Sequence, residues 1–163
     1  MSLLEVIPDV LLLGLIYSYL YKRLKSLKNK QVIKYNTLFY MSLSLIILIT
    51  LSPFIISIPN LFNSHIKSYN FELFVDWKYQ YGNYIIDTLF NIILFIPFSF
   101  SFYLATKKKP LNIIISGFLL SLLIEFIQPL LFESRIGDIT DLFNNTIGTI
   151  IGVLIAYLLF RDN

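Results

Sequence analysis

Residues 111–132 read LNIIISGFLLSLLIEFIQPLLF, and residues 139–160 read ITDLFNNTIGTIIGVLIAYLLF. Each stretch is mainly apolar and about as long as the 20 residues that an α-helix needs to cross a bilayer. A short polar segment, residues 133–138, separates them. The pattern predicts two membrane-spanning helices joined by a short loop.

The composition of the whole chain points the same way. Of its 163 residues, 56% are hydrophobic and only 14% are charged. A soluble domain has roughly 45–50% apolar and about 25% charged residues, and so few charges cannot cover the surface of a soluble protein of this size. The composition excludes a disordered chain, a nucleic-acid-binding domain and an ordinary cytosolic enzyme. It favours an integral membrane protein whose partners are membrane lipids.

Three further segments are long and apolar enough to cross a membrane, namely Leu3–Tyr21, Leu38–Ile58 and Tyr84–Ala105. Together with the first two they predict an all-α, polytopic bundle of five transmembrane helices. Between the second and third spans, residues 71–77 mix large apolar residues with acids. We expect this segment to lie in the membrane interface as a short helix or strand, or as a loop.

Basic residues gather in two of the loops. Six follow the first span and three follow the third: Lys22, Arg23, Lys25, Lys28, Lys30 and Lys34, then Lys107, Lys108 and Lys109. The positive-inside rule places both loops in the cytoplasm, which predicts the N-terminus outside and the C-terminus inside. Residues 1–35 form the first helix with its basic loop, and residues 36–163 form the remaining membrane domain.

Polar residues cluster near the outer ends of the last three spans. At 1.5 Å per residue, Asn91 and Glu125 lie about 10 Å below the outer helix ends, and Asn145 lies roughly 6–9 Å below. Ionisable residues inside spans are costly and mark function by default. We therefore expect a polar, acidic cavity open to the extracytoplasmic side. Its candidate residues are Asp87, Asn91, Glu125, Gln128, Arg135, Asp138, Asp141, Asn144 and Asn145.

Prolines and glycines shape the same helices. Pro97 and Pro129 donate no backbone hydrogen bond, so each leaves a carbonyl four residues earlier without its helical partner. Gly148 and Gly152 are spaced by four and permit close helix packing. We expect the small and polar faces of the last two spans to turn toward each other.

Purely structural roles remain open for several of these residues. The acids Asp138 and Asp141 suit the cap of the last helix, and the two asparagines Asn91 and Asn145 suit hydrogen bonds between helices. The chain has no cysteine, and His65 is its only histidine. Thiolate sites and zinc sites of the HExxH type are thus excluded, and no metal or cofactor is expected.

The motifs assembled here resemble those of the VanZ-like family. They are Asn91 to Phe98 (NIILFIPF), Glu125 to Gln128 (EFIQ), Gly137 to Asp141 (GDITD), and Asn145 to Gly148 (NTIG) followed by Gly152. Their order and spacing match over about residues 91–157, with motif-bearing helices at 84–160. One departure is Ser99, where the family usually has glycine.

The resemblance implies a small multi-pass protein of the bacterial cytoplasmic membrane, with a four-helix core to which the first helix is added. The family takes its name from an accessory protein of glycopeptide resistance that lowers susceptibility to teicoplanin. A role at the cell envelope, including antibiotic resistance, is the corresponding expectation.

Three functions compete on these grounds. The first is binding of an outer-leaflet amphiphile, such as a lipid-linked cell-wall precursor or a lipoglycopeptide, with Arg135 available to meet a phosphate. The second is a membrane-embedded enzyme acting on a lipid phosphate or ester, with Glu125 as general base. Asp138, Asp141 and Asn145 would then hold a divalent cation through oxygen ligands, although no nucleophile–base–orienter set is visible. The third is a small transporter, although the inner half of the last three spans is nearly all apolar. The sequence leaves a homo-oligomer open.

Overall fold

Five long helices dominate the fold of this chain, for which a computed structural model describes residues 3–62 and 68–161. They are α1 (Leu3–Ser26), α2 (Lys30–Leu51), α5 (Tyr84–Thr106), α6 (Pro110–Leu131) and α7 (Ile139–Phe160). Each is apolar enough, and at 1.5 Å per residue long enough, to cross the hydrocarbon core of about 30 Å. The predicted all-α bundle with five membrane-spanning helices is confirmed.

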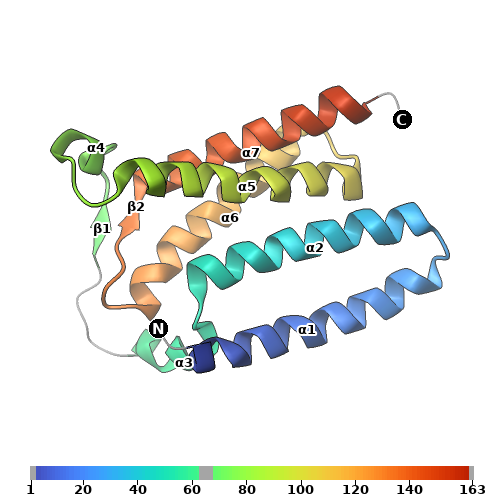
Figure 1. Ribbon diagram of the computed structural model, residues 1–163, viewed down its shortest axis with the longest axis horizontal. Coiled ribbons are helices and arrows are strands. Elements are labelled where there is room, and N and C mark those ends of the chain that lie inside the picture. Colours follow the sequence, from blue (N-terminus) through green and yellow to red (C-terminus); the bar gives the residue numbers. More distant parts are fainter. Residues whose placement is uncertain (1–2, 63–67, 162–163) are drawn as a thin grey trace.

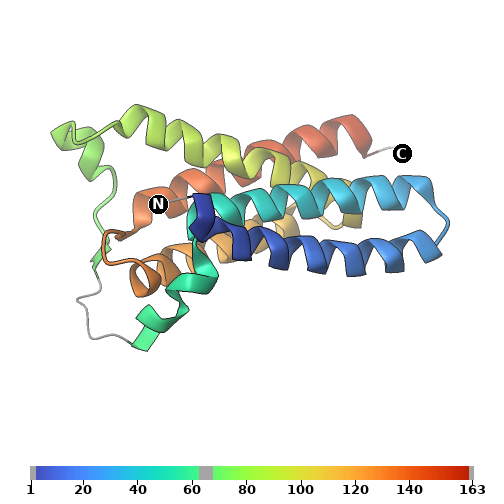
Figure 2. The same cartoon turned by 60° about the horizontal axis from the view of Figure 1, so that its bottom comes forward.

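Successive long helices run antiparallel, so that their connections alternate between the two ends of the bundle (Figure 1). The most extensive contact is between α5 and α7, and α6 packs on α7 while α2 packs on α5. Helix α1 continues beyond its predicted end at Tyr21 and lies along α2 (Figure 2). It is the least buried of the five, so α1 is a peripheral helix on a core of four.

The second span begins and ends earlier than the predicted range, Leu38–Ile58, because α2 covers Lys30–Leu51. At its start, the side chain of Asn29 accepts hydrogen bonds from two backbone N–H groups of the first turn. At its end, Pro53 disfavours a helical backbone at Ser52, which is extended with ψ 145°. Local capping and proline sterics, rather than hydropathy, set these bounds.

The connection between α2 and α5 has its own short elements. These are α3 (Phe54–Ser57), the 3-10 helix η1 (Ile58–Phe62), β1 (Tyr69–Asn70) and α4 (Val75–Tyr79). The segment expected in the membrane interface thus contains a short helix. His65 lies outside the described residues.

Strand β1 pairs in parallel with β2 (Gly137–Asp138), which directly precedes α7. Strands this short carry no periodic pattern, and the sequence did not predict them. Their pairing fixes the α2–α5 connection to the beginning of α7.

Apolar side chains fill the bundle in two clusters. One lies between α2, α5 and α6 and contains Ile46, Leu94, Phe95, Phe98 and Ile124. The other lies near the C-terminal ends of α5 and α7 and the beginning of α6. It contains Tyr103, Leu104, Ile113, Val153 and Ala156. At the end of the bundle where α5 and α7 begin, polar residues gather beside the first of these clusters.

Candidate functional site

A polar cavity of about 370 Å³ lies at the end of the bundle where α5 and α7 begin. Of the residues assigned to a cavity from the sequence, all except Asn144 line it: Asp87, Asn91, Glu125, Gln128, Arg135, Asp138, Asp141 and Asn145. Asn144 is buried in α7, only 2% exposed. Three long helices and the α6–α7 loop therefore bring these side chains together.

Sequence reasoning missed several other residues of the wall, including residues from outside α5, α6 and α7. Asp76 and Trp77 of α4, together with Thr50 of α2 and Thr140 of α7, also line the cavity. The acids and the tryptophan within residues 71–77 could have indicated these wall residues. Acidic and aromatic residues in a membrane interface commonly belong to a binding site or to the aromatic belt.

Hydrogen bonds tie the cavity residues of neighbouring helices together. Nδ2 of Asn91 on α5 donates to Oδ1 of Asp141 on α7 at 2.5 Å. Nδ2 of Asn145 on α7 donates to Oγ of Ser121 on α6 at 2.9 Å. Interhelical bonds of this kind hold helices in lipid, so both asparagines have a structural role as well as a place in the cavity.

Glu125 is the most deeply buried acid of the cavity, 7% exposed. Its Oε2 accepts a hydrogen bond of 3.0 Å from the backbone N–H of Asp138. The approach is close because Gly137 has no side chain: a Cβ there would collide with the carbonyl oxygen of Glu125. Pro129, four residues on, cannot donate to that same carbonyl, and β2 occupies the space beside it.

Asp138 of β2 is linked to both β1 and α7 in the cavity wall. Its Oδ1 accepts from the backbone N–H of Thr140 at 2.6 Å, which caps α7. Its Oδ2 accepts from Nδ2 of Asn70 at 2.9 Å, which holds β1. This acid therefore caps the helix and also belongs to the cavity wall.

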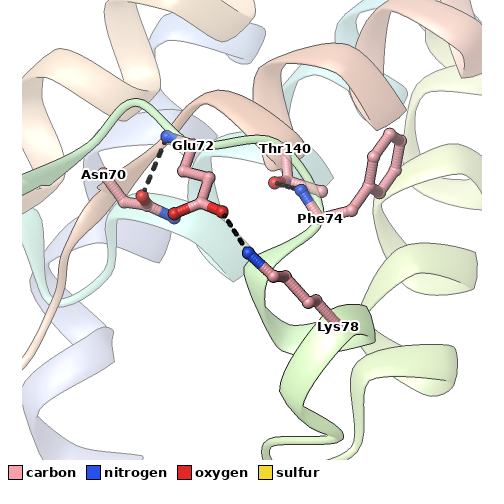
Figure 3. A network of polar contacts seen from close by, with 5 residues as sticks. All are labelled: Asn70, Glu72, Phe74, Lys78 and Thr140. Carbon is pink, nitrogen blue, oxygen red and sulfur yellow. Dashed lines mark hydrogen bonds and ion pairs between the residues drawn. The ribbon is translucent and has the colours of Figure 1, made fainter.

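The α2–α5 connection is anchored over the start of α7 (Figure 3). The backbone N–H of Phe74 donates to Oγ1 of Thr140 at 2.9 Å, and the backbone N–H of Glu72 donates to Oδ1 of Asn70 at 3.0 Å. Glu72 also pairs with Lys78 at 3.1 Å, which raises the pKa of Lys78 above its ordinary value of 10.5. This exposed ion pair joins the segment before α4 to α4 itself, beside the cavity.

The two glycines of α7 pack mainly on α5 rather than α6. A Cβ at Gly148 would collide with the carbonyl oxygen of Ile92, and one at Gly152 would collide with the carbonyl oxygen of Ile96 and with Oγ of Ser99. The expected contact between α6 and α7 is made instead near Gly117, where a Cβ would collide with Thr149. Close packing thus holds the α5 and α7 walls of the cavity together.

An apolar groove of about 320 Å³ adjoins the polar cavity. Glu125 and Asp138 belong to the walls of both, and the rest of the groove is formed mainly by apolar side chains of β1, α6 and α7. These are Tyr69, Phe71, Leu122, Phe126, Ile139 and Leu142. A polar and an apolar compartment thus lie on either side of a shared wall.

The chain was compared with known proteins. No match was found among curated proteins or among solved structures. A family model described as VanZ/LLP1 matches residues 32–161, which include α5, α6 and α7 and every residue that lines the cavity. The five apolar helices and this match identify the chain as a membrane protein that belongs to the VanZ/LLP1 family.

Proposed function

We propose that this protein acts at the cell envelope by binding an outer-leaflet amphiphile, such as a lipid-linked cell-wall precursor or a lipoglycopeptide. The observation that carries the proposal is the polar cavity with the apolar groove beside it, sharing Glu125 and Asp138. A molecule with a polar head group and an apolar chain has matching surroundings for both parts. A purely polar solute would leave the groove empty.

The charge distribution supports an extracytoplasmic cavity. The α1–α2 and α5–α6 loops, which carry the basic residues, lie at one end of the bundle (Figure 1). The residues that line the cavity lie at the other end. The positive-inside rule puts the basic end in the cytoplasm. The cavity then opens toward the outer leaflet of the bacterial cytoplasmic membrane.

The apolar core favours binding over transport. Below the cavity, Phe95, Phe98 and Ile124 are almost fully buried, and a second apolar cluster follows toward the cytoplasmic end. A polar head group that crossed the bundle would lose its hydrogen bonds there. The cavity is therefore a place where such a group binds rather than the entrance of a pathway.

Drug susceptibility tests the proposal in cells. We expect expression of the wild-type protein to reduce susceptibility to teicoplanin, and Glu125→Gln or Asp141→Asn to abolish the protection at equal expression. The matched control is Glu133→Gln, which removes an exposed acid at the same end of the bundle but outside the cavity wall.

Two results would contradict this proposal. Protection that survives both cavity substitutions would remove the cavity from the mechanism. A changed lipid profile in thin-layer chromatography, dependent on Glu125, would instead favour the alternative of an enzyme acting on a lipid phosphate or ester.

A further inference from the structure

We infer that the cavity selects an amphiphile with a positively charged ammonium head group. This inference rests on the proposed binding of an amphiphile and narrows the ligand to one with a cationic head group, which disfavours a ligand held through a phosphate at Arg135. It follows from three features of the wall: its carboxyl groups, its occupied donors, and one buried acceptor without a partner.

The carboxyl groups are distributed along the depth of the cavity. Asp76 and Asp87 are exposed at the mouth, Asp138 and Asp141 are half-buried, and Glu125 is the deepest. Among the residues that the structure describes, the only lysine or arginine in the wall is Arg135, whose side chain is exposed. A cation entering the cavity thus meets acids at every level.

Three side-chain N–H groups of the wall already donate hydrogen bonds within the protein. Nδ2 of Asn91 donates to Asp141, Nε2 of Gln128 donates to the carbonyl of Thr50, and Nε1 of Trp77 donates to Thr88. The second N–H of each amide stays available, but the carboxyl groups of the wall repel a phosphate, and among the described residues Arg135 is its one cation. The wall therefore disfavours an anionic head group.

Asn145 gives independent support. Its Nδ2 donates to Ser121, whereas its Oδ1 is buried without a hydrogen-bond partner among the described residues. The residue is 2% exposed and lines the cavity. A buried acceptor left unpaired is costly, and a ligand that donates N–H groups would satisfy it.

An ammonium group matches this wall better than a metal ion does. It has three donors and no acceptor, and the rings of Trp77 and Tyr84, whose centroids are 4.9 Å apart, supply aromatic surface in the same wall. Aromatic rings attract cations. Among the described residues, no three His, Cys, Asp or Glu side chains are placed to hold a metal ion.

The experiment uses the single tryptophan of the chain, Trp77, as a reporter within the cavity wall. The purified full-length protein, in an uncharged maltoside detergent, is titrated with dodecylammonium, dodecyl phosphate or dodecanol, which share one alkyl chain. We expect a saturable change of Trp77 emission with dodecylammonium at concentrations about tenfold lower than with the other two.

Matched variants then locate the binding. Asp141→Asn and Glu125→Gln keep side-chain shape and are expected to weaken dodecylammonium binding about tenfold, whereas Glu133→Gln is expected to bind like the wild type. Circular dichroism checks that each variant is folded. If a buried substitution unfolds the protein, Asp87→Asn at the exposed mouth replaces it, with an expected loss of about threefold.

Other outcomes would exclude the ammonium head group, the organic cation or amphiphile binding as a whole. Tighter or equal binding of dodecyl phosphate or dodecanol would refute the ammonium head group while leaving amphiphile binding intact. A saturable response to magnesium chloride that blocks dodecylammonium would replace it with an inorganic cation. The absence of any saturable response to the three probes would refute both this inference and the proposed function.

Discussion

Asp9 is an acid within the apolar helix α1, and only 3% of it is exposed. Its carboxylate accepts hydrogen bonds from Oγ of Ser52 at 2.6 Å, from the backbone N–H of Phe54 at 2.7 Å and from that of Ile55 at 2.9 Å. These bonds hold α1 against the beginning of α3. A carboxyl group one or two turns into an apolar span is a recognisable sequence signal, but its partners become visible only in the folded chain.

We expect Asp9→Asn to destabilise the protein by about 1–3 kcal/mol, because an amide N–H₂ would face donors and leave at least one of them unpaired in the interior. Unfolding in mixed detergent micelles measures the change. Asp76→Asn, the same chemical change at an exposed position, is the control and should leave the free energy of unfolding nearly unchanged. Equal stability of both variants would show that the Asp9 bonds contribute nothing.

The contact between α5 and α7 depends on two positions of α7 that have no side chain. Gly148 and Gly152 place the backbone of α7 directly against carbonyl groups of α5. Ser99 of α5 fits because Gly152 leaves room for its hydroxyl. The same contact aligns Asn91 with Asp141 across the cavity.

We expect Gly148→Ala or Gly152→Ala to lower the free energy of unfolding by about 1–3 kcal/mol, since the added methyl group forces the two helices apart. The chain supplies a control in Gly14, where an added Cβ meets nothing within 4 Å. Gly14→Ala should not lower the free energy of unfolding, and helix propensity raises it by up to about 1 kcal/mol. If all three variants unfold alike, helix propensity rather than packing governs the response.

The long helices were predictable, whereas the segments that cover the site were not. Apolar runs of about 20 residues define spans by length alone, and the polar positions of α5, α6 and α7 could be aligned by depth along each helix. The bounds of α2 and the β1–β2 pairing depend on Asn29, Pro53 and Asn70, whose effects are local caps or tertiary contacts. Asp76 and Trp77 therefore lie at the cavity because of the path of the α2–α5 connection, which no hydrophobic periodicity in the sequence predicts.

Basic and acidic residues gather at opposite ends of the bundle. The lysine-rich loops lie at one end, and the cavity with its five acids lies at the other. The apolar clusters in between separate the two ends. Such an asymmetric molecule has a functional orientation, because only one orientation presents the cavity to an outer-leaflet ligand.

The orientation can be measured directly because the chain has no cysteine. Glu133→Cys marks the exposed loop at the cavity end, and Lys109→Cys marks the exposed basic loop at the other. In intact cells, we expect a membrane-impermeant maleimide to label position 133 fully and position 109 only after the membrane is permeabilised, since the positive-inside rule holds the lysines in the cytoplasm. The reverse pattern would leave the fold unchanged but turn the cavity toward the cytoplasm, and an outer-leaflet ligand would then be ruled out.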